Sequence, residues 1–431
     1  MKLHGTMGIK DNTLYIGGVS TKELAKKYNT PLYVFDEELI RGNCREYKEF
    51  FKVKENKNKI AYAGKAFLTK YMCQLINEEG VYLDVVSGGE LYTAHKANFP
   101  MERILFHGNN KTLDEIEMGV NLGVGIFVVD NFYELDILEK LCCEKNKVQN
   151  IYFRVTPGID AHTHKYIKTG QIDSKFGFAL TNGDFYIAVE KLKDYKNVNL
   201  MGIHAHIGSQ IFEVSPYEEE VDIMLNLVKK LKEDYNVEIK EVDFGGGIGV
   251  YYTENDRPKS IKEFCEKIIK KCDEKCQELN IKVPTLILEP GRSLVANAGS
   301  TLYSIGSIKE IKDVRTYVSV DGGMTDNIRP SLYQAGYECA IVDKMNNEEG
   351  SHKVTIAGKC CESGDILISN TNIFDIESGD ILITTSTGAY GYSMASNYNK
   401  IPKNPVVFVN NGEDKLICKR QSYEDLLSLE L

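Results

Sequence analysis

The sequence contains no apolar stretch close to the about 20 residues that a membrane-spanning helix needs. Its first ten residues, MKLHGTMGIK, lack the apolar core of a secretory signal peptide. Low-complexity tracts are absent, and basic residues are outnumbered by acidic ones, which gives a net charge of −10. That charge argues against a general nucleic-acid binder and against a protein that binds anionic membranes. We therefore expect a soluble, cytoplasmic globular protein.

The eleven cysteines lack the pattern of a disulfide framework, because their number is odd and their spacing is irregular. Cys265, Cys272 and Cys276 are seven and four residues apart, which places them on one face of a predicted helix. A metal site is the alternative, but no histidine or carboxylate is placed to complete it. We therefore expect these three cysteines to pack as small apolar side chains and predict no metal.

Between residues 58 and 290 the sequence alternates short apolar runs with longer amphipathic segments. The short runs are typical of buried strands, and the longer segments have helical periodicity. Eight such repeats predict a (β/α)8 TIM-type barrel, whereas a doubly wound sheet more often has fewer strands and an early GxGxxG motif. The predicted strands are IAYAG (60–64), YLDVVS (82–87), RILFHG (103–108), GIFVVD (125–130), IYFRVTP (151–157), MGIHAHIG (201–208), EVDFGGG (241–247) and TLILEPG (285–291).

After Arg292 the pattern changes to short β-rich segments separated by turn residues. This predicts a C-terminal antiparallel β-barrel or sandwich domain. DNTLYIGGV, residues 11–19, also has the pattern of a strand, and we expect it to join this sheet. The predicted boundaries are an N-terminal segment at 1–35, the barrel at 36–292 and the β domain at 293–431.

Polar residues gather where the predicted strands end, and the active sites of (β/α)8 barrels lie at that rim. Each residue alone has an ordinary structural explanation, but their coincidence at one rim predicts the functional site there. The residues are Lys65, Asp84, Ser87, His107, Asn109, Asp130, Asn131, Arg154, His206, Ser209, Gly245, Gly246, Gly247, Glu289 and Arg292.

The chemistry of three rim segments points to one cofactor. AYAGKAF places Lys65 between apolar residues, where partial burial disfavours the charged amine and makes it nucleophilic. DFGGGIG offers backbone N–H groups that suit a phosphate, although a tight turn explains a lone glycine run equally well. Glu289 in EPGR would hold a proton on a ring nitrogen. Together these features describe a pyridoxal-phosphate pocket.

HAHIGS allows a second interpretation. His204 and His206 alternate along a predicted strand, so they would face one side and could bind a metal, as in barrel hydrolases. The rim lacks the further histidines and aspartates that such a site needs. In the pyridoxal-phosphate interpretation, His206 lies flat on the pyridine ring and Ser209 contacts the phosphate. Two packed histidines without a functional role are the third possibility.

Residues 30–400 resemble the pyridoxal-phosphate decarboxylases whose barrel is like that of alanine racemase. YAGKA, HIGS and EPGR are similar to motifs of the wider family, which includes ornithine and arginine decarboxylases. DAHTHKYIKTG, IRPSLY and CESGD resemble the branch that acts on diaminopimelate. Lys359, in GKCCESGD, departs from the family pattern, which usually has proline there; the departure concerns loop shape more than chemistry.

The resemblance implies roles for individual residues. Lys65 would carry pyridoxal 5'-phosphate covalently, Glu289 would pair with the ring nitrogen, and Cys361 would donate a proton. The far carboxylate of the substrate would contact Arg292, Arg329 and Tyr333, and its far ammonium would contact Glu362. Tyr390 would also bind the substrate. The residues implied in cofactor binding are Lys65, His206, Ser209, Gly245, Gly246, Gly247, Glu289, Pro290, Gly291, Arg292 and Tyr390.

The implied reaction converts meso-2,6-diaminopimelate to L-lysine and carbon dioxide, the last step of lysine biosynthesis, in a homodimer with shared active sites. The far end of this substrate carries both charges, which suits the pair of Glu362 and Arg329. The alternatives are a related decarboxylase acting on ornithine, arginine or carboxynorspermidine, a metal-dependent barrel hydrolase, and a non-catalytic pyridoxal-phosphate carrier. Whether Cys361 acts on its own chain or on the partner is left open by the sequence.

Overall fold

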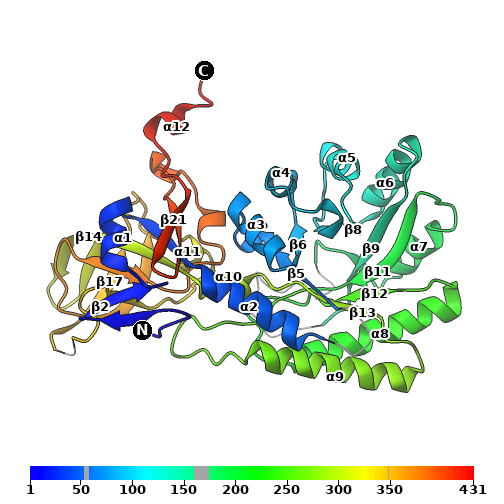
Figure 1. Ribbon diagram of the computed structural model, residues 1–431, viewed down its shortest axis with the longest axis horizontal. Helices are drawn as coiled ribbons and strands as arrows, with labels where there is room; N and C mark the ends of the chain where they lie inside the picture. Colours follow the sequence, from blue (N-terminus) through cyan, green and yellow to red (C-terminus); the bar gives the residue numbers. More distant parts are fainter. Residues whose placement is uncertain (53–57, 160–173, 348) are drawn as a thin grey trace. The chain divides into compact units, whose positions relative to one another are not determined.

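The computed structural model describes residues 1–52, 58–159, 174–347 and 349–431, which form two compact units (Figure 1). One unit contains residues 43–249 and 258–293, and the other contains residues 1–42, 250–257 and 294–431. We call them the barrel unit and the sheet unit after the architecture of each, and describe them separately.

The barrel unit is built on parallel strands that close into a ring. Every pairing in the ring is parallel, and the last strand pairs with the first. All the predicted strands are present, and the predicted TIM-type barrel is confirmed. The order is β5 (Lys59–Ala63), β6 (Tyr82–Val85), β7 (Ile104–Phe106), β8 (Ile126–Val129), β9 (Gln149–Thr156), β11 (Val198–His204), β12 (Glu241–Asp243) and β13 (Thr285–Leu288), with β10 (Phe178–Ala179) beside β9.

Helices connect these strands and lie outside the ring, as Figure 1 shows for α3 to α6 and for α8 and α9. Helix α9 buries Cys265, Cys272 and Cys276 on one face as free thiols, so the predicted packing of these cysteines is confirmed. The helices are α2 (Glu37–Phe50), α3 (Lys70–Glu78), α4 (Gly88–Lys96), α5 (Leu113–Leu122), α6 (Phe132–Glu144), α7 (Asp184–Lys191), α8 (Ser215–Tyr235) and α9 (Ile261–Leu279).

The sheet unit is built on one large sheet. Most of its pairings are antiparallel, as predicted, but β15 pairs with β17 and β20 pairs with β4 in parallel, so the sheet is mixed. Strand β19 (Ile381–Thr384) pairs with β14 and with β16 (Cys339–Ile341). The order is β18 (Ile366–Phe374), β17 (Ser351–Ala357), β15 (Arg315–Val320), β14 (Gly299–Ile311), β4 (Leu32–Asp36), β20 (Val406–Asn410) and β21 (Glu413–Cys418). The short helices are α1 (Thr21–Tyr28), α11 (Arg329–Tyr333) and α12 (Tyr423–Leu427), while α10 (Arg292–Val295) begins in the barrel unit and ends in the sheet unit.

The N-terminal strand that enters this sheet is β4, not the segment 11–19 that the sequence pattern suggested. That segment contains β2 (Thr13–Ile16), which forms a separate small sheet with β1 (Gly8–Lys10) and β3 (Val19–Ser20). All residues of β4 are buried, as a strand covered on both faces requires, whereas the residues of β2 alternate between buried and half-buried. Continuous burial therefore decides which strand lies between β14 and β20.

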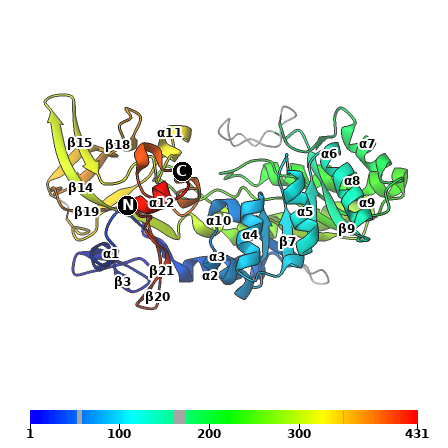
Figure 2. The same ribbon diagram turned by 90° about the horizontal axis from the view of Figure 1, so that it is seen from above.

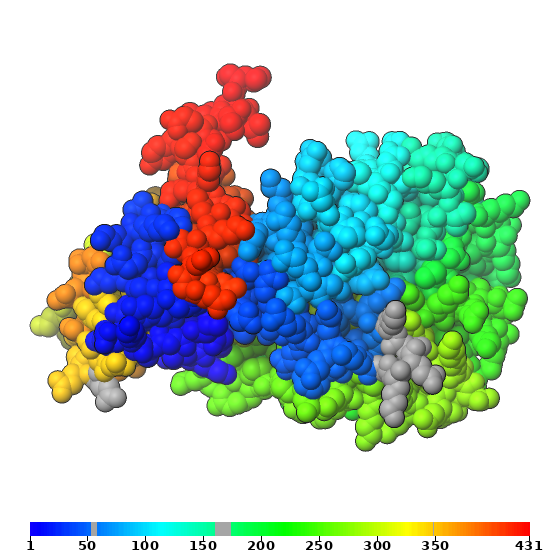
Figure 3. Space-filling view, in the orientation of Figure 1, coloured from blue at the N-terminus to red at the C-terminus, as the bar shows by residue number. Residues whose placement is uncertain are grey.

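The small N-terminal sheet still packs against the large one. Leu14 and Ile16 belong to the same buried cluster as Leu302, Val407 and Val409. The carbonyl oxygen of Gly17 accepts a hydrogen bond from the N–H of Gly412, at 2.7 Å, in the turn between β20 and β21. Figures 2 and 3 show the N-terminal residues in blue beside this red hairpin, so both ends of the chain contribute to the sheet unit.

Candidate active site

Lys65 lies directly after strand β5, in a short 3₁₀ turn over Gly64–Ala66. Its side chain is exposed, while the flanking Ala66 and Phe67 are completely buried. The EPGR turn packs against this segment, because the N–H of Ala63 donates to the carbonyl oxygen of Pro290 at 3.1 Å. The partial burial expected for Lys65 is therefore not found: the residue is exposed, on an apolar base beside the predicted phosphate turn.

The glycine loop after β12 has no room for side chains. A Cβ atom on Gly246 would lie 2.1 Å from the carbonyl oxygen of Glu289, and one on Gly247 would lie 2.2 Å from that of Gly208. Gly247 also has φ of +107°, a conformation that side chains disfavour. The loop is therefore pressed against two neighbouring strand ends, and only glycine permits that approach.

The predicted bare N–H groups of this loop are only partly found, because two of them donate to side chains of the protein. Gly245 donates to Oδ1 of Asp243 at 2.8 Å, and Gly246 donates to Nδ1 of His206 at 3.3 Å. Across the described ranges, the N–H groups of Gly247 and Gly291 have no protein acceptor. Free N–H groups on two adjacent turns fit a phosphate.

Arg292 and Ser209 join the EPGR and HIGS motifs. Nη2 and Nε of Arg292 donate to Oγ of Ser209 at 2.9 and 3.3 Å. The expectation that His204 and His206 alternate along one strand is wrong, because β11 ends at His204 and His206 lies beyond it. Strand alternation therefore does not relate the two histidines: His206 faces the N–H of Gly246, and His204 faces Glu289.

Glu289 lies between two histidines inside the barrel. Its Oε1 is 2.7 Å from Nε2 of His107, and its Oε2 is 3.1 Å from Nε2 of His204. Burial by itself would raise the pKa of the Glu289 carboxyl, but the two imidazoles outweigh it and hold this pKa well below its usual value. The sequence analysis placed His107 at the rim without assigning it a role.

The three polar groups of His107, His204 and Glu289 lie within 4.8 Å of one another, close enough to bind a metal ion. Hydrogen bonds already account for this arrangement, since each carboxylate oxygen faces one imidazole nitrogen. His206, which the hydrolase interpretation combined with His204, is not a member of this group.

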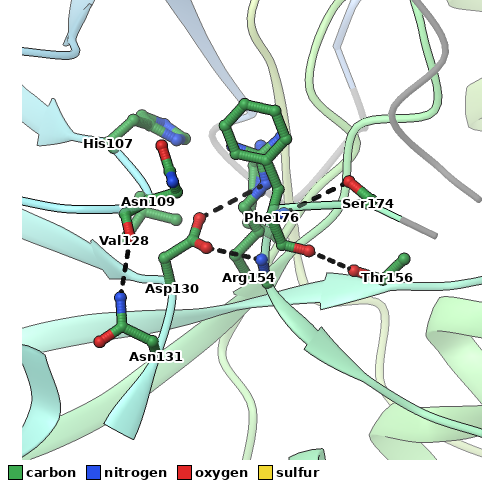
Figure 4. Close-up of polar contacts among 12 residues, drawn as sticks. His107, Asn109, Val128, Asp130, Asn131, Arg154, Thr156, Ser174 and Phe176 are labelled. Carbon is green, nitrogen blue, oxygen red and sulfur yellow. Dashed lines mark hydrogen bonds and ion pairs between the residues drawn. The ribbon is translucent and has the colours of Figure 1, made fainter. Parts of the chain in front are cut away.

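Arg154 is a buried cation next to these groups (Figure 4). Its Nε is 3.9 Å from Oδ2 of Asp130, and its guanidinium lies 4.2 Å from the centre of the Phe176 ring. The other Asp130 oxygen accepts the N–H of Gly177 at 2.6 Å, and Thr156 donates to the carbonyl of Phe176 at 2.6 Å. These contacts fix the segment after β9 to the rim.

Other rim residues have structural roles. Ser87 and Asn131 cap α4 and α6, accepting the N–H groups of Glu90 and Glu134. Nζ of Lys111 forms a completely buried ion pair with Glu134 at 2.7 Å. This lysine is therefore committed to the fold.

In the sheet unit, Arg329 is buried at the start of α11 with 7% of its surface exposed. Its guanidinium lies 4.7 Å from the centre of the Tyr252 ring, and Nη1 is 2.5 Å from Oη of Tyr337. No carboxylate within the described part of the chain forms an ion pair with it. A buried cation without an anionic partner is costly, so this position suits an anionic ligand.

The CESGD loop lies beside α11. Oγ of Ser331 donates to the carbonyl oxygen of Gly364 at 2.7 Å, which ties Arg329 and Tyr333 on the helix to Cys361 and Glu362 on the loop. Cys361 is exposed, and its N–H donates to Oδ1 of Asn399 at 2.8 Å.

Asp365 holds this loop from inside, a role the motif alone did not reveal. Its buried carboxylate accepts the N–H of Met324 at 2.6 Å and that of Cys360 at 2.7 Å. Tyr390, in GAYGYSMASNYN, has φ of 62°, which is uncommon for a bulky residue and often marks a functional position.

The predicted residues thus form two groups, one within each unit. Lys65, His206, Ser209, the glycine loop and the EPGR turn gather at the rim of the barrel, and Arg329, Tyr333, Cys361, Glu362 and Tyr390 belong to the sheet unit. DAHTHKYIKTG, residues 160–170, lies outside the described residues.

Comparison with known proteins identifies the family. Residues 37–296, more than half of the chain, match the family described as pyridoxal-dependent decarboxylase, pyridoxal binding domain. The chain is 49% identical to the diaminopimelate decarboxylase of Bacillus subtilis over 432 aligned residues, covering 100% of this chain and 98% of that protein. It is 50% identical to the Bacillus methanolicus enzyme of the same name, with 98% of each chain covered.

Solved structures agree with the sequence relatives. The diaminopimelate decarboxylase of M. jannaschii in complex with L-lysine has a TM-score of 0.92 and 37% identity, covering 99% of this chain and 98% of that one. The Helicobacter pylori diaminopimelate decarboxylase, also complexed with L-lysine, has a TM-score of 0.87 and 31% identity, covering 95% and 98%. This chain therefore belongs to the diaminopimelate decarboxylases, a family of pyridoxal-dependent decarboxylases.

Proposed function

We propose that this protein converts meso-2,6-diaminopimelate to L-lysine and carbon dioxide with pyridoxal 5'-phosphate, in the last step of lysine biosynthesis. The family supports the reaction type. The choice of substrate rests on the buried Arg329, which forms no ion pair with a carboxylate among the described residues. A substrate whose non-reacting end is itself an amino acid brings the carboxylate that this cation lacks.

The barrel rim fits the cofactor. The free N–H groups of Gly247 and Gly291 and the Arg292–Ser209 pair would hold the phosphate, together with Gly245, Gly246, Pro290 and Tyr390. Lys65 would bind the cofactor through its exposed amine. His206 would stack on the ring, and Glu289 would contact the ring nitrogen. When bound, the protonated pyridine ring supplies an electron sink for cleavage of the bond to the leaving carboxylate.

The sheet-unit residues would bind the other end of the substrate. Arg329, with Arg292 and Tyr333, would bind the far carboxylate, and Glu362 would accept the far ammonium. Tyr390 would also contact the substrate. Cys361, which is exposed, would donate the proton that replaces the departing carbon dioxide. Ornithine has no far carboxylate to neutralise Arg329, so it should be a poor substrate.

We also propose a homodimer with shared active sites, in which Cys361 of each chain serves the partner subunit. A two-fold interface forms two equivalent sites at once. We further propose a cytoplasmic location, which the free thiols of this cysteine-rich chain favour because reducing compartments preserve them. Within the described ranges, no helix is long and apolar enough to cross a membrane.

Incubation of the purified protein with meso-diaminopimelate and, separately, with ornithine or arginine tests the proposal. We expect carbon dioxide and L-lysine from the first substrate and at most trace release from the others. Equal release from ornithine would overturn the substrate assignment. Hydrolase activity that depends on added zinc, without bound pyridoxal phosphate, would overturn the reaction class.

A further inference from the structure

Three residues from separate strands meet inside the barrel around one carboxylate. His107 follows β7, His204 ends β11 and Glu289 follows β13, and each is at most 6% exposed. The centroids of the two imidazole rings are 4.7 Å apart, and the ring planes are at an angle of 70°. Their Nε2 atoms contact different oxygens of Glu289. Each oxygen of the Glu289 carboxylate therefore faces one imidazole nitrogen from another part of the barrel.

The protonation of His204 follows from its surroundings. Its Nδ1 is buried and has no hydrogen-bond partner in the described structure. A buried N–H without an acceptor is costlier than a bare lone pair, so the proton belongs on Nε2, where it is donated to Glu289. Burial lowers the pKa of His204 to about 3, so the ring is neutral and carries only this proton.

The neighbouring carboxyl groups behave differently from Glu289. Burial raises the pKa of Asp84, whose Oδ1 is 3.8 Å from Nε2 of His107. Burial also raises the pKa of Asp243, the residue that accepts the N–H of Gly245. Lys65 and Arg154 are the cationic residues whose charges act on this cluster. Among these three carboxyl groups, the negative charge is therefore on Glu289, the one that two imidazoles contact.

A carboxyl group beside a pyridine nitrogen shares one proton with it. In a dry pocket, burial favours the uncharged arrangement, with the proton on the carboxyl group. Donors to the carboxylate favour the charged arrangement, with the proton on the ring. We propose that His107 and His204 are positioning residues that keep Glu289 ionised, so that the shared proton stays on the pyridine nitrogen of the cofactor. This inference rests on the pyridoxal-phosphate function proposed above.

The test measures the protonation state of the ring nitrogen directly. The wild type and the variants His107→Leu, His204→Leu and the double variant are loaded with pyridoxal phosphate labelled with ¹⁵N in the ring. We expect the ¹⁵N chemical shift of a protonated ring in the wild type at neutral pH and that of an unprotonated ring in the double variant. His107→Gln and His204→Gln keep a donor near the carboxylate and should keep more of the protonated signal than the leucine variants. A protonated ring in the double variant would overturn the proposal.

Two controls keep the outcome clear. His4→Leu removes another neutral histidine, whose pKa burial lowers to about 4, but in the sheet unit; it should leave the ring signal unchanged. If the double variant does not bind the cofactor, ¹⁵N-histidine spectra of the wild-type holoenzyme decide the matter, because His204 with its proton on Nδ1 would overturn the proposal. A wild-type protein that binds no pyridoxal phosphate would instead overturn the proposed function.

Discussion

Oη of Tyr217, on the outer helix α8, donates a 2.9 Å hydrogen bond to the carbonyl oxygen of Gly246 in the glycine loop. Tyr217 is 1% exposed, and its ring packs edge-on against Phe264 of α9 at a centroid distance of 5.6 Å. A rigid side chain from the helical layer thus supports the loop whose N–H groups face the proposed phosphate.

Tyr217→Phe should therefore weaken cofactor binding without unfolding the barrel. The loss of one buried hydrogen bond is worth about 0.5–1.5 kcal/mol, which corresponds to an increase in the dissociation constant of about 2–10-fold. Titration of the apoprotein with pyridoxal phosphate measures this dissociation constant. Tyr33→Phe is the matched control, because it removes a buried hydroxyl bonded to the backbone carbonyl of Asp326 in the sheet unit. Equal affinities in the wild type and the Tyr217 variant would show that the loop needs no support from α8.

Lys65 should be the residue that carries the cofactor, because it combines exposure with an apolar base at the barrel rim. Borohydride should bleach the absorption of the bound cofactor and fix the label to the peptide containing Lys65, as mass spectrometry would show. Lys65→Ala should lose the label, and Lys70→Ala, at an exposed position on α3, should retain it. Labelling of any other lysine contradicts the assignment.

Glu362→Ala should reduce kcat/KM for meso-diaminopimelate by an amount equivalent to about 2–5 kcal/mol, because the far ammonium loses its acceptor. Glu377→Ala is the control, since Glu377 is an exposed glutamate of the same unit whose side chain is 75% accessible. Steady-state kinetics of the two variants give the comparison. Equal specificity constants would mean that Glu362 does not contact the substrate.

Subunit mixing should reveal whether Cys361 acts on the partner chain. Lys65→Ala and Cys361→Ala should each be inactive alone. If Cys361 acts on the partner chain, equal mixing should make half of the dimers mixed, each with one intact site, and restore roughly a quarter of wild-type activity. Lys65→Ala mixed with Glu289→Ala is the negative control, because both residues belong to the same barrel. No recovery in the first mixture, with subunit exchange verified by mass, would place Cys361 in its own chain's site.

Glu220 should make the stability of the protein fall as pH rises. Its carboxyl group on α8 is completely buried, neither oxygen has a partner in the described structure, and burial raises its pKa well above the usual value. The unfolded chain releases this proton above about pH 4.3, whereas the folded chain retains it. Unfolding therefore releases a proton, and stability falls by about 1.4 kcal/mol per pH unit until the folded pKa is reached.

Glu220→Gln should remove this dependence, since the amide does not ionise. Thermal unfolding at pH 5 and pH 8 measures the effect, and the variant should gain more in Tm relative to the wild type at pH 8. Glu266→Gln, at an exposed position on α9, should show no such difference between the two pH values. A parallel pH dependence in the wild type and the Glu220 variant would mean that Glu220 is ionised in the folded state.

The sequence by itself determined the barrel and the residues at its rim. Short apolar runs and amphipathic helical segments depend on the local side-chain pattern, so the eight strands and the buried face of α9 that carries Cys265 could be predicted from the sequence. The resemblance to the motifs of a known family predicted functional roles for Lys65, Glu289, Arg329 and Cys361, from the types of the residues and their order in the chain. These features depend on neighbours along the chain.

The tertiary structure decided the partners of those residues. His107 and His204 meet at Glu289 because closure of the barrel brings the end of β7 near the ends of β11 and β13, which no local pattern specifies. The same holds for the choice of β4 over the segment 11–19, where burial on both faces depends on strands contributed by both ends of the chain. Whether a buried charge such as Arg329 is paired likewise depends on distant segments. Local periodicity determines which face of a helix or strand is buried, and only tertiary packing determines which residues that face contacts.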